Sequence, residues 1–203
     1  AGFALGHTRL SILDLSAEGH QPMATPDGRF TIAYNGEVYN FEILRAELES
    51  AGHRFRSHCD TEVILHAIQA WGIEQALSRF VGMFAFALWD ARERNLFVAR
   101  DRLGIKPLYW GMQGGTLLFG SELKSCRIHP AFRPALDRDA LALYLRHNYI
   151  PEPHSIFQGF HKLPPGCWAR FRSPSREPEI HRYWDAREVA RAGLDSPCQA
   201  ADH

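Results

Sequence analysis

The sequence predicts an α+β fold, and three observations support this prediction. Several short segments alternate apolar and polar residues and are divided by turn-rich stretches, as antiparallel strands are. Two or three other segments repeat apolar residues at helical spacing and lie among these strands. The phosphate loops G-x-G-x-x-G and G-x-x-x-x-G-K-[ST] of doubly wound nucleotide-binding folds are absent. A layered fold of antiparallel sheets and helices is therefore favoured over a parallel sheet.

The first two elements lie on either side of the heptapeptide YNGEVYN. Residues 29–35 alternate apolar and polar side chains, which predicts a half-buried strand that ends at Asn35. From Phe41, apolar residues recur at helical spacing, with Asn40 as the expected N-cap and Gly52 as the end. An Asn-Gly pair is also a strong hairpin signal, but no second alternating strand follows it directly. The heptapeptide is therefore predicted to connect a strand to a helix.

The remaining elements follow in chain order. A second helix is expected over 61–71, with Asp60 or Thr61 as its cap, and a third over 138–146 behind Asp137. The stretches DARERN and MQGG are typical of turns between antiparallel strands. The segment from Tyr149 to Gly166 is expected to be a long ordered loop. Strands are predicted over residues 82–89, 96–100, 107–111, 116–120 and 167–171.

Composition excludes several classes of protein. The 203 residues are 45% hydrophobic and 23% charged with a formal net charge of +0, so neither nucleic acid nor an anionic membrane is an expected partner. No apolar run is long enough for a membrane span and no signal peptide is visible, which makes the cytoplasm the expected compartment. Four scattered cysteines without a C-x-x-C pair predict reduced thiols: Cys59, Cys126, Cys167 and Cys198.

Four residues carry groups that suit recognition of an α-amino acid. Arg9 offers a planar fork for a carboxylate, and Asp60 could hold an ammonium group. The Asn35 side-chain amide and the Gly36 backbone amide could together stabilise an oxyanion. Each also has a structural alternative: an internal ion pair for Arg9, an N-cap for Asp60 and a plain turn for the Asn-Gly pair.

A metal site is a weaker alternative for the stretch SHCDTEVILH. Its histidines, cysteine and acidic residues do not share one helical face, and their spacing matches no zinc motif. His66 is expected to serve in helix packing or to lie on the surface. No metal is therefore expected.

Several stretches together resemble one family. These are GHTRLSILDLSAEGHQPM, YNGEVYNFEILRAEL, GHRFRSHCDTEVILHA, GMFAFALWD, ARDRLGIKPLYWG and FGSELKS, and they span about residues 6–171 in family order. They are similar to the glutaminase domain of glutamine-hydrolysing asparagine synthetases, a class II glutamine amidotransferase of the N-terminal nucleophile type. The resemblance implies a four-layer αββα sandwich of antiparallel sheets with glutamine bound at the sheet ends.

The resemblance also implies roles for individual residues. Arg9 would bind the α-carboxylate of glutamine and Asp60 its α-ammonium. Asn35 and the Gly36 amide would form the oxyanion hole, and Glu37 would line the same pocket. In RDRLGIKPLY, the basic residues Arg102 and Lys106 are candidates for facing a partner domain, with ion pairs inside the domain as the alternative.

One departure from the family pattern concerns catalysis. The family uses a nucleophilic cysteine at the mature N-terminus, and residue 1 here is alanine. The cysteine and a first strand would lie upstream of AGFALGHTRL, so we expect an incomplete domain that binds glutamine at most. Cys59 adjoins the proposed ammonium ligand and lacks the terminal amine that the chemistry uses, so it cannot replace that nucleophile.

The C-terminal part is expected to lead towards a second domain. Residues 1–172 would form the incomplete glutaminase domain, and residues 173–203 a linker or the start of a synthetase domain. The resemblance implies that this missing domain binds ATP and Mg²⁺ and amidates aspartate, that this chain itself holds no cofactor, and that the full-length parent could be a homodimer. The alternatives are a non-catalytic glutamine-binding or synthetase-partner module, or an amidotransferase of another branch.

Overall fold

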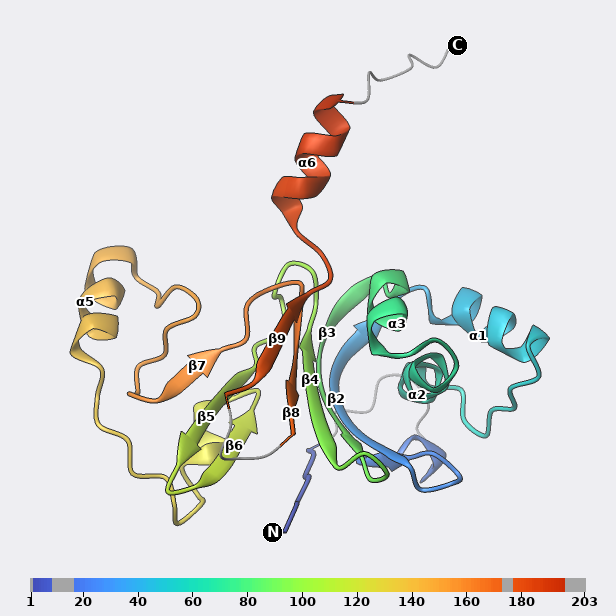
Figure 1. The fold of residues 1–203 in the computed structure, drawn as a ribbon, viewed down its shortest axis with the longest axis horizontal. Coiled ribbons are helices and arrows are strands. Elements are labelled where there is room, and N and C mark those ends of the chain that lie inside the picture. The colour runs from blue at the N-terminus through green and yellow to red at the C-terminus, as the bar shows by residue number, and fades with distance from the viewer. Residues whose placement is uncertain (1, 9–16, 173–176, 196–203) are drawn as a thin grey trace.

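A computed structural model describes residues 2–8, 17–172 and 177–195. Within these residues the chain forms two antiparallel sheets, here called sheet A and sheet B (Figure 1). Sheet A has the order β1-β2-β3-β4-β8-β9 and sheet B the order β6-β5-β7. The strands are β1 (Met23–Ala24), β2 (Phe30–Val38), β3 (Gly82–Asp90), β4 (Asn95–Arg100), β5 (Tyr109–Gln113), β6 (Thr116–Gly120), β7 (Phe160–Lys162), β8 (Cys167–Phe171) and β9 (Glu179–Arg182).

Helices cover the outer faces of the two sheets. Three helices pack on sheet A, and sheet B lies against its other face (Figure 1). The outer face of sheet B is covered by α4 and by the chain around Phe132. This helix–sheet–sheet–helix order confirms the predicted α+β sandwich. The helices are α1 (Phe41–Ser50), α2 (Asp60–Trp71), α3 (Ile73–Arg79), α4 (Leu123–Cys126), α5 (Arg138–His147) and α6 (Ala186–Asp195), with a 3₁₀ turn η1 (Ala17–Gly19).

The central strands of sheet A are buried on both faces, and the alternate side chains of β3 are an example. Phe84 and Phe86 pack into the core beneath the helices, while Ala85 and Ala87 point towards sheet B. Because side chains alternate across a strand, large residues fill the helical side and small ones face the second sheet. The small residues keep the space between the two sheets open beside them.

The predicted hairpins are confirmed by the strand pairing. β3 pairs with β4 across the DARERN turn, and β5 pairs with β6 across MQGG. Sequence patterning missed the helices α3, α4 and α6 and three short strands, β1, β7 and β9, which have two to four residues each. The three short strands carry too little alternation to be recognised, and their partners set their register. β7 lies inside the stretch that was expected to be a loop.

Three local predictions are wrong. The first strand does not end at Asn35 but continues to Val38, so the Asn-Gly pair lies inside β2 and makes no hairpin. Asn40 precedes α1 but does not cap it with its side chain, which instead bonds Arg79 and Val81. Asp60 is the first residue of α2 rather than its cap, and Thr61 is its second.

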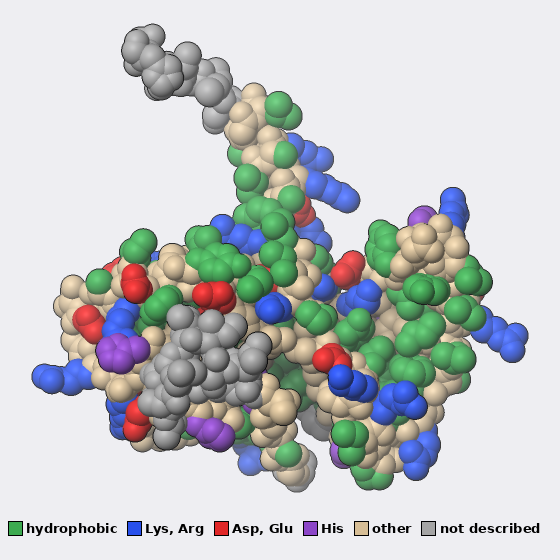
Figure 2. Space-filling model, turned by 180° about the vertical axis from the view of Figure 1, so that it is seen from behind, with side chains coloured by type: hydrophobic (Ala, Val, Ile, Leu, Met, Phe, Trp, Pro, Cys, Tyr) green, Lys and Arg blue, Asp and Glu red, His purple; other side chains and the backbone are tan. Residues whose placement is uncertain are grey.

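The C-terminal segment begins as part of sheet A. β9 pairs with β8, and α6 then projects away from both sheets (Figures 1 and 2). Val189 and Leu194 of α6 are exposed. The expected domain boundary after residue 172 and the expected missing first strand stay predictions. In the part of the chain that the structure describes, no helix is both long and apolar enough to cross a membrane.

Candidate functional site

A cavity of about 690 Å³ lies between the two sheets. Sheet A contributes the second half of β2 and the small residues of β3, and sheet B contributes β6 and the turn that follows it. The N-terminal residues 4–8 and Lys106 also line the cavity. Asn35, Gly36, Glu37 and Asp60 all lie in its wall. The structure thus brings together four of the five predicted site residues, while Arg9 lies outside the described residues.

The backbone amide of Gly36 faces the outer edge of β2. Gly36 is paired with Phe84 of β3, whose N–H and C=O both bond Asp101 on the opposite side. In an antiparallel sheet the N–H and C=O of one residue point the same way, so this is a non-hydrogen-bonded pair. The Gly36 N–H therefore points away from β3.

Neighbouring amides on the same edge are already bound by side chains. The Tyr34 N–H donates to Gln21 Oε1 at 2.7 Å, and the Val38 N–H donates to Asp60 Oδ2 at 3.0 Å. Alternate residues of a strand present their amides to one edge, so the Gly36 amide lies between these two bonds. This edge beside the cavity is a suitable place for a donor to a ligand carbonyl.

Position 36 has no room for a side chain. A Cβ there would lie 2.2 Å from the Met83 carbonyl oxygen and 2.6 Å from the Phe84 Cα. The backbones of β2 and β3 approach this closely only because residue 36 is glycine. The position of the Gly36 amide therefore depends on the residue type.

The Asn35 side chain reaches from sheet A towards sheet B. Its Nδ2 donates to Ser121 Oγ at 3.3 Å, in the turn after β6. A side-chain amide has two N–H donors, so this bond orients the amide and leaves the second donor for a ligand. Sequence reasoning assigned no role to Ser121, although it lies in the quoted stretch FGSELKS.

Asp60 is a buried acid held by β2 rather than a helix cap. Its Oδ2 accepts hydrogen bonds from the Tyr34 hydroxyl at 2.6 Å and from the Val38 amide. The residue is 5% exposed. Burial raises the pKa of Asp60, and these two donors act in the opposite direction. The N-cap interpretation is therefore wrong, and the carboxylate remains a candidate ammonium ligand.

The cavity wall contains charged side chains that form no ion pair with the residues that the structure describes. Glu37 and Lys106 form no ion pair within the described residues, whereas Lys124 pairs with Glu122 at 2.6 Å. Lys106 lines the cavity and forms no ion pair among the described residues, and its expected role in facing a partner domain stays a prediction. Arg102 from the same loop donates to the Ser78 carbonyl at 2.8 Å. Separate positive and negative groups suit a zwitterionic ligand.

Two buried residues shape the loop that carries Lys106. The Asp101 carboxylate accepts hydrogen bonds from the amides of Leu103, Ile105 and Lys106 at 2.9–3.1 Å. Arg100 binds the carbonyl oxygens of Gly104, Lys106 and Leu163 at 2.7–2.8 Å. Buried charges are tolerated when such bonds satisfy them. The loop is therefore rigidly attached to the end of β4.

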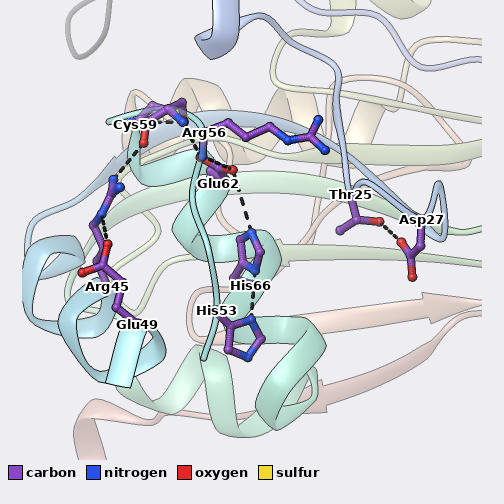
Figure 3. A network of polar contacts seen from close by, with 10 residues as sticks. Thr25, Asp27, Arg45, Glu49, His53, Arg56, Cys59, Glu62 and His66 are labelled. Carbon is purple, nitrogen blue, oxygen red and sulfur yellow. Dashed lines mark hydrogen bonds and ion pairs between the residues drawn. The ribbon is translucent and has the colours of Figure 1, made fainter. Parts of the chain in front are cut away.

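A polar network supports the loop that leads into α2 (Figure 3). The Glu62 carboxylate accepts bonds from the Ser57 hydroxyl and from the amides of Arg56 and Ser57 at 2.7–3.1 Å. His66 Nε2 lies 3.8 Å from Glu62, and the Nδ1 atoms of His66 and His53 are 3.0 Å apart. This network holds the loop directly before Asp60.

The Glu62 network makes stability depend on pH. Burial acts to raise the pKa of Glu62, but the nearby His66 imidazole and hydrogen bonds from Ser57 and the Arg56 amide outweigh burial and lower it from 4.5 to about 2. A lowered carboxyl pKa contributes stability above the unfolded value, and this contribution is lost as the pH falls from 4.5 to 2. We expect Glu62→Gln to lower the free energy of unfolding at pH 7 and to flatten its decline below pH 4.5, as measured by urea titration. An equally steep acid decline in both proteins would contradict this.

The cysteines that the structure describes are buried, and the stretch SHCDTEVILH builds no metal site among the described residues. Cys59 lines the cavity but is 2% exposed, and burial raises the pKa of the Cys126 and Cys167 thiols. Thiolates are the reactive form, so the last two are poor nucleophiles. No group of three or more His, Cys, Asp or Glu side chains among the described residues is arranged to hold a metal ion. Cys198 lies outside the described residues.

Comparisons with known proteins agree with this architecture. The profile of a family described as the glutamine amidotransferase domain matches residues 1–184. Asparagine synthetase [glutamine-hydrolyzing] 3 of Bacillus subtilis is 41% identical over 183 residues, which cover 89% of this chain and 29% of that protein. A putative asparagine synthetase [glutamine-hydrolyzing] of Mycobacterium bovis is 41% identical over 199 residues, covering 93% and 30%. The chain thus spans about 30% of the length of these curated relatives.

A solved structure extends the comparison to the fold. Glutamine phosphoribosylpyrophosphate amidotransferase from B. subtilis, complexed with ADP and GMP, superimposes with a TM-score of 0.61 and 24% sequence identity. The match covers 87% of this chain and 34% of that one. The layered sheets described above therefore have the same fold as the matched part of that structure. Since the family profile covers most of its length, the chain belongs to the glutamine amidotransferase domain family.

Proposed function

We propose that this chain is the glutamine-binding part of an asparagine synthetase and that its cavity takes L-glutamine. The main supporting observation is that Asn35, Gly36 and Asp60 meet in one cavity in a chain of this family. Asp60 would bind the α-ammonium and Arg9 the α-carboxylate. Glu37 would line the pocket beside them.

The carboxamide of glutamine would then lie at the outer edge of β2. The second Asn35 N–H and the Gly36 N–H would donate to its carbonyl oxygen. Such donors are most effective when they are held in place before the reaction, and Ser121 and the close β2–β3 contact provide that restraint here. The chemistry also requires a nucleophile, and none of the described cysteines is an exposed thiol beside these donors. We therefore propose that the chain by itself binds glutamine without hydrolysing it.

The remaining parts of the proposal concern the longer protein. Relatives about three times as long are named asparagine synthetases, so we propose that a synthetase domain follows this one. Residues 173–203 would lead towards that domain, starting from β9, which pairs with sheet A. ATP and Mg²⁺ would bind there, with aspartate as the ammonia acceptor, in a cytoplasmic protein that could act as a homodimer.

Calorimetric titration of the chain tests the proposal. We expect binding of L-glutamine and L-glutamate but not of L-leucine, because the site recognises the α-groups and a polar side chain. Asp60→Asn should weaken glutamine binding by about tenfold or more, since the variant loses a charge-assisted bond to the ammonium. Asp27→Asn is the matched control, because Asp27 lies outside the cavity lining and should leave the affinity unchanged. Equal heats for all three amino acids would refute the proposal.

A further inference from the structure

The two oxygens of the Asp60 carboxylate have different environments. The hydrogen bonds from the Tyr34 hydroxyl at 2.6 Å and from the Val38 amide at 3.0 Å both end on Oδ2. Oδ1 carries no side-chain partner among the described residues. Asp60 lines the cavity, so Oδ2 is held by β2 while Oδ1 is the oxygen that a ligand ammonium could approach.

Tyr34 is built into the core and acts only as a donor. It is 3% exposed and lies on the helical face of β2, in contact with the buried residues of the main core. Burial, together with the charges of Asp60 and Glu37, raises the pKa of the Tyr34 phenol far above its ordinary value. A phenol that stays protonated can donate to a carboxylate at every pH at which the protein is folded.

A buried acid can bind an ammonium group only if it is ionised. Burial favours the neutral form of Asp60, and hydrogen bonds to its charged form favour ionisation. Among the described side chains, the Tyr34 hydroxyl is the donor to this carboxylate. We propose that Tyr34 is a positioning residue for ligand recognition, because its hydroxyl holds Asp60 Oδ2 and thereby aims an ionised Oδ1 at the α-ammonium of an amino acid.

Other titratable groups line the same cavity, and their charges also act on the titration of Asp60. Glu37 follows on the same strand as Tyr34, and Cys59 precedes Asp60 in the loop. The N-terminal segment contributes His7, and the side of sheet B contributes Lys106, Glu122 and Lys124. Since all of them remain in a Tyr34 variant, a change in the titration of Asp60 reports the lost hydroxyl.

The inference rests on the proposed function for the identity of the ligand, but its first test does not. We would follow the Asp60 side-chain ¹³C signal against pH in the free chain, assigned by its disappearance in Asp60→Asn. Tyr34→Phe is expected to move the midpoint of Asp60 to higher pH. The control is Tyr183→Phe, which also removes a hydroxyl bond, the partly buried one from Tyr183 to the Arg100 carbonyl at 2.9 Å, and leaves the Tyr34–Asp60 bond in place. This control should leave the midpoint unchanged.

The second test measures the affinity for L-glutamine against pH. Affinity should hold above the Asp60 midpoint and fall by about tenfold per pH unit below it, because binding needs the ionised acid. In Tyr34→Phe this fall should begin at higher pH. A purely structural role for Tyr34 would weaken binding equally at every pH and leave the Asp60 midpoint in place, which would overturn the inference.

Two further outcomes are distinguished by these measurements. If Asp60 responds to Tyr34→Phe as expected but the chain binds no glutamine at any pH, the proposed ligand is wrong while the hydroxyl still controls the acid. If Tyr34→Phe fails to fold, incorporation of 3-fluorotyrosine replaces it. Its phenol is a stronger donor, so the Asp60 midpoint should then move to lower pH, and an unchanged midpoint would overturn the inference.

Discussion

Replacement of Asp101 by alanine is expected to cost about 3–5 kcal/mol of folding free energy. Asp101 is fully buried, and its carboxylate accepts four backbone amides: those of Phe84, Leu103, Ile105 and Lys106, at 2.9–3.2 Å. Alanine leaves these donors without an acceptor, at the junction between β3 and the loop after β4. Urea unfolding followed by circular dichroism would measure the loss.

The variant Asp101→Asn tests the two carboxylate oxygens separately, because each accepts two of the four amides. Oδ1 accepts from Leu103 and Ile105, and Oδ2 accepts from Phe84 and Lys106. Asparagine keeps one acceptor oxygen but turns an NH₂ group towards the other two amides. Its loss of folding free energy should therefore be at least intermediate between zero and the loss for Asp101→Ala. Asp139→Ala, at an exposed position in α5, should change stability by less than about 0.5 kcal/mol. If Asp101→Ala lost equally little folding free energy, the four amides would be hydrogen-bonded to water in place of the carboxylate.

The second large effect is expected for Gly36→Ala, at about 3 kcal/mol or more. The contact of a Cβ at 2.2 Å from the Met83 carbonyl oxygen cannot be relieved by rotating a side chain, because the β2 backbone fixes the Cβ and the oxygen belongs to the β3 backbone. β2 and β3 must separate, and this displaces the Gly36 amide from the cavity edge. The variant should therefore also bind glutamine more weakly than its remaining folded fraction accounts for.

Gly193→Ala serves as the control for the change of residue type. A Cβ at position 193 meets no atom within 4 Å and lies in the exposed helix α6, where alanine is the better helix former. This variant should be neutral or slightly more stable. Thermal unfolding of both variants and calorimetry with glutamine would check the pair. An equal response of the two glycines would mean that β2 and β3 tolerate a wider spacing.

Much of the architecture could be predicted from the sequence because its signals are local. Alternation in the residues of β2 to β6 and helical spacing in α1, α2 and α5 located these elements to within a few residues. The boundary errors arose where local chemistry suggested a different structure. Asn35-Gly36 has the composition of a turn, yet continuous pairing with β3 keeps it in a strand.

The same contrast holds for the candidate site. The sequence by itself determined which residue types could recognise an amino acid, and the motif resemblance selected Arg9, Asn35, Gly36, Glu37 and Asp60 among them. Only the tertiary structure decided how the described four are held. Asp60 meets Tyr34 across 26 positions and Asn35 meets Ser121 across 86, since folding brings α2 and sheet B to the edge of β2. Such contacts depend on packing between distant elements, and no local pattern of residues encodes them.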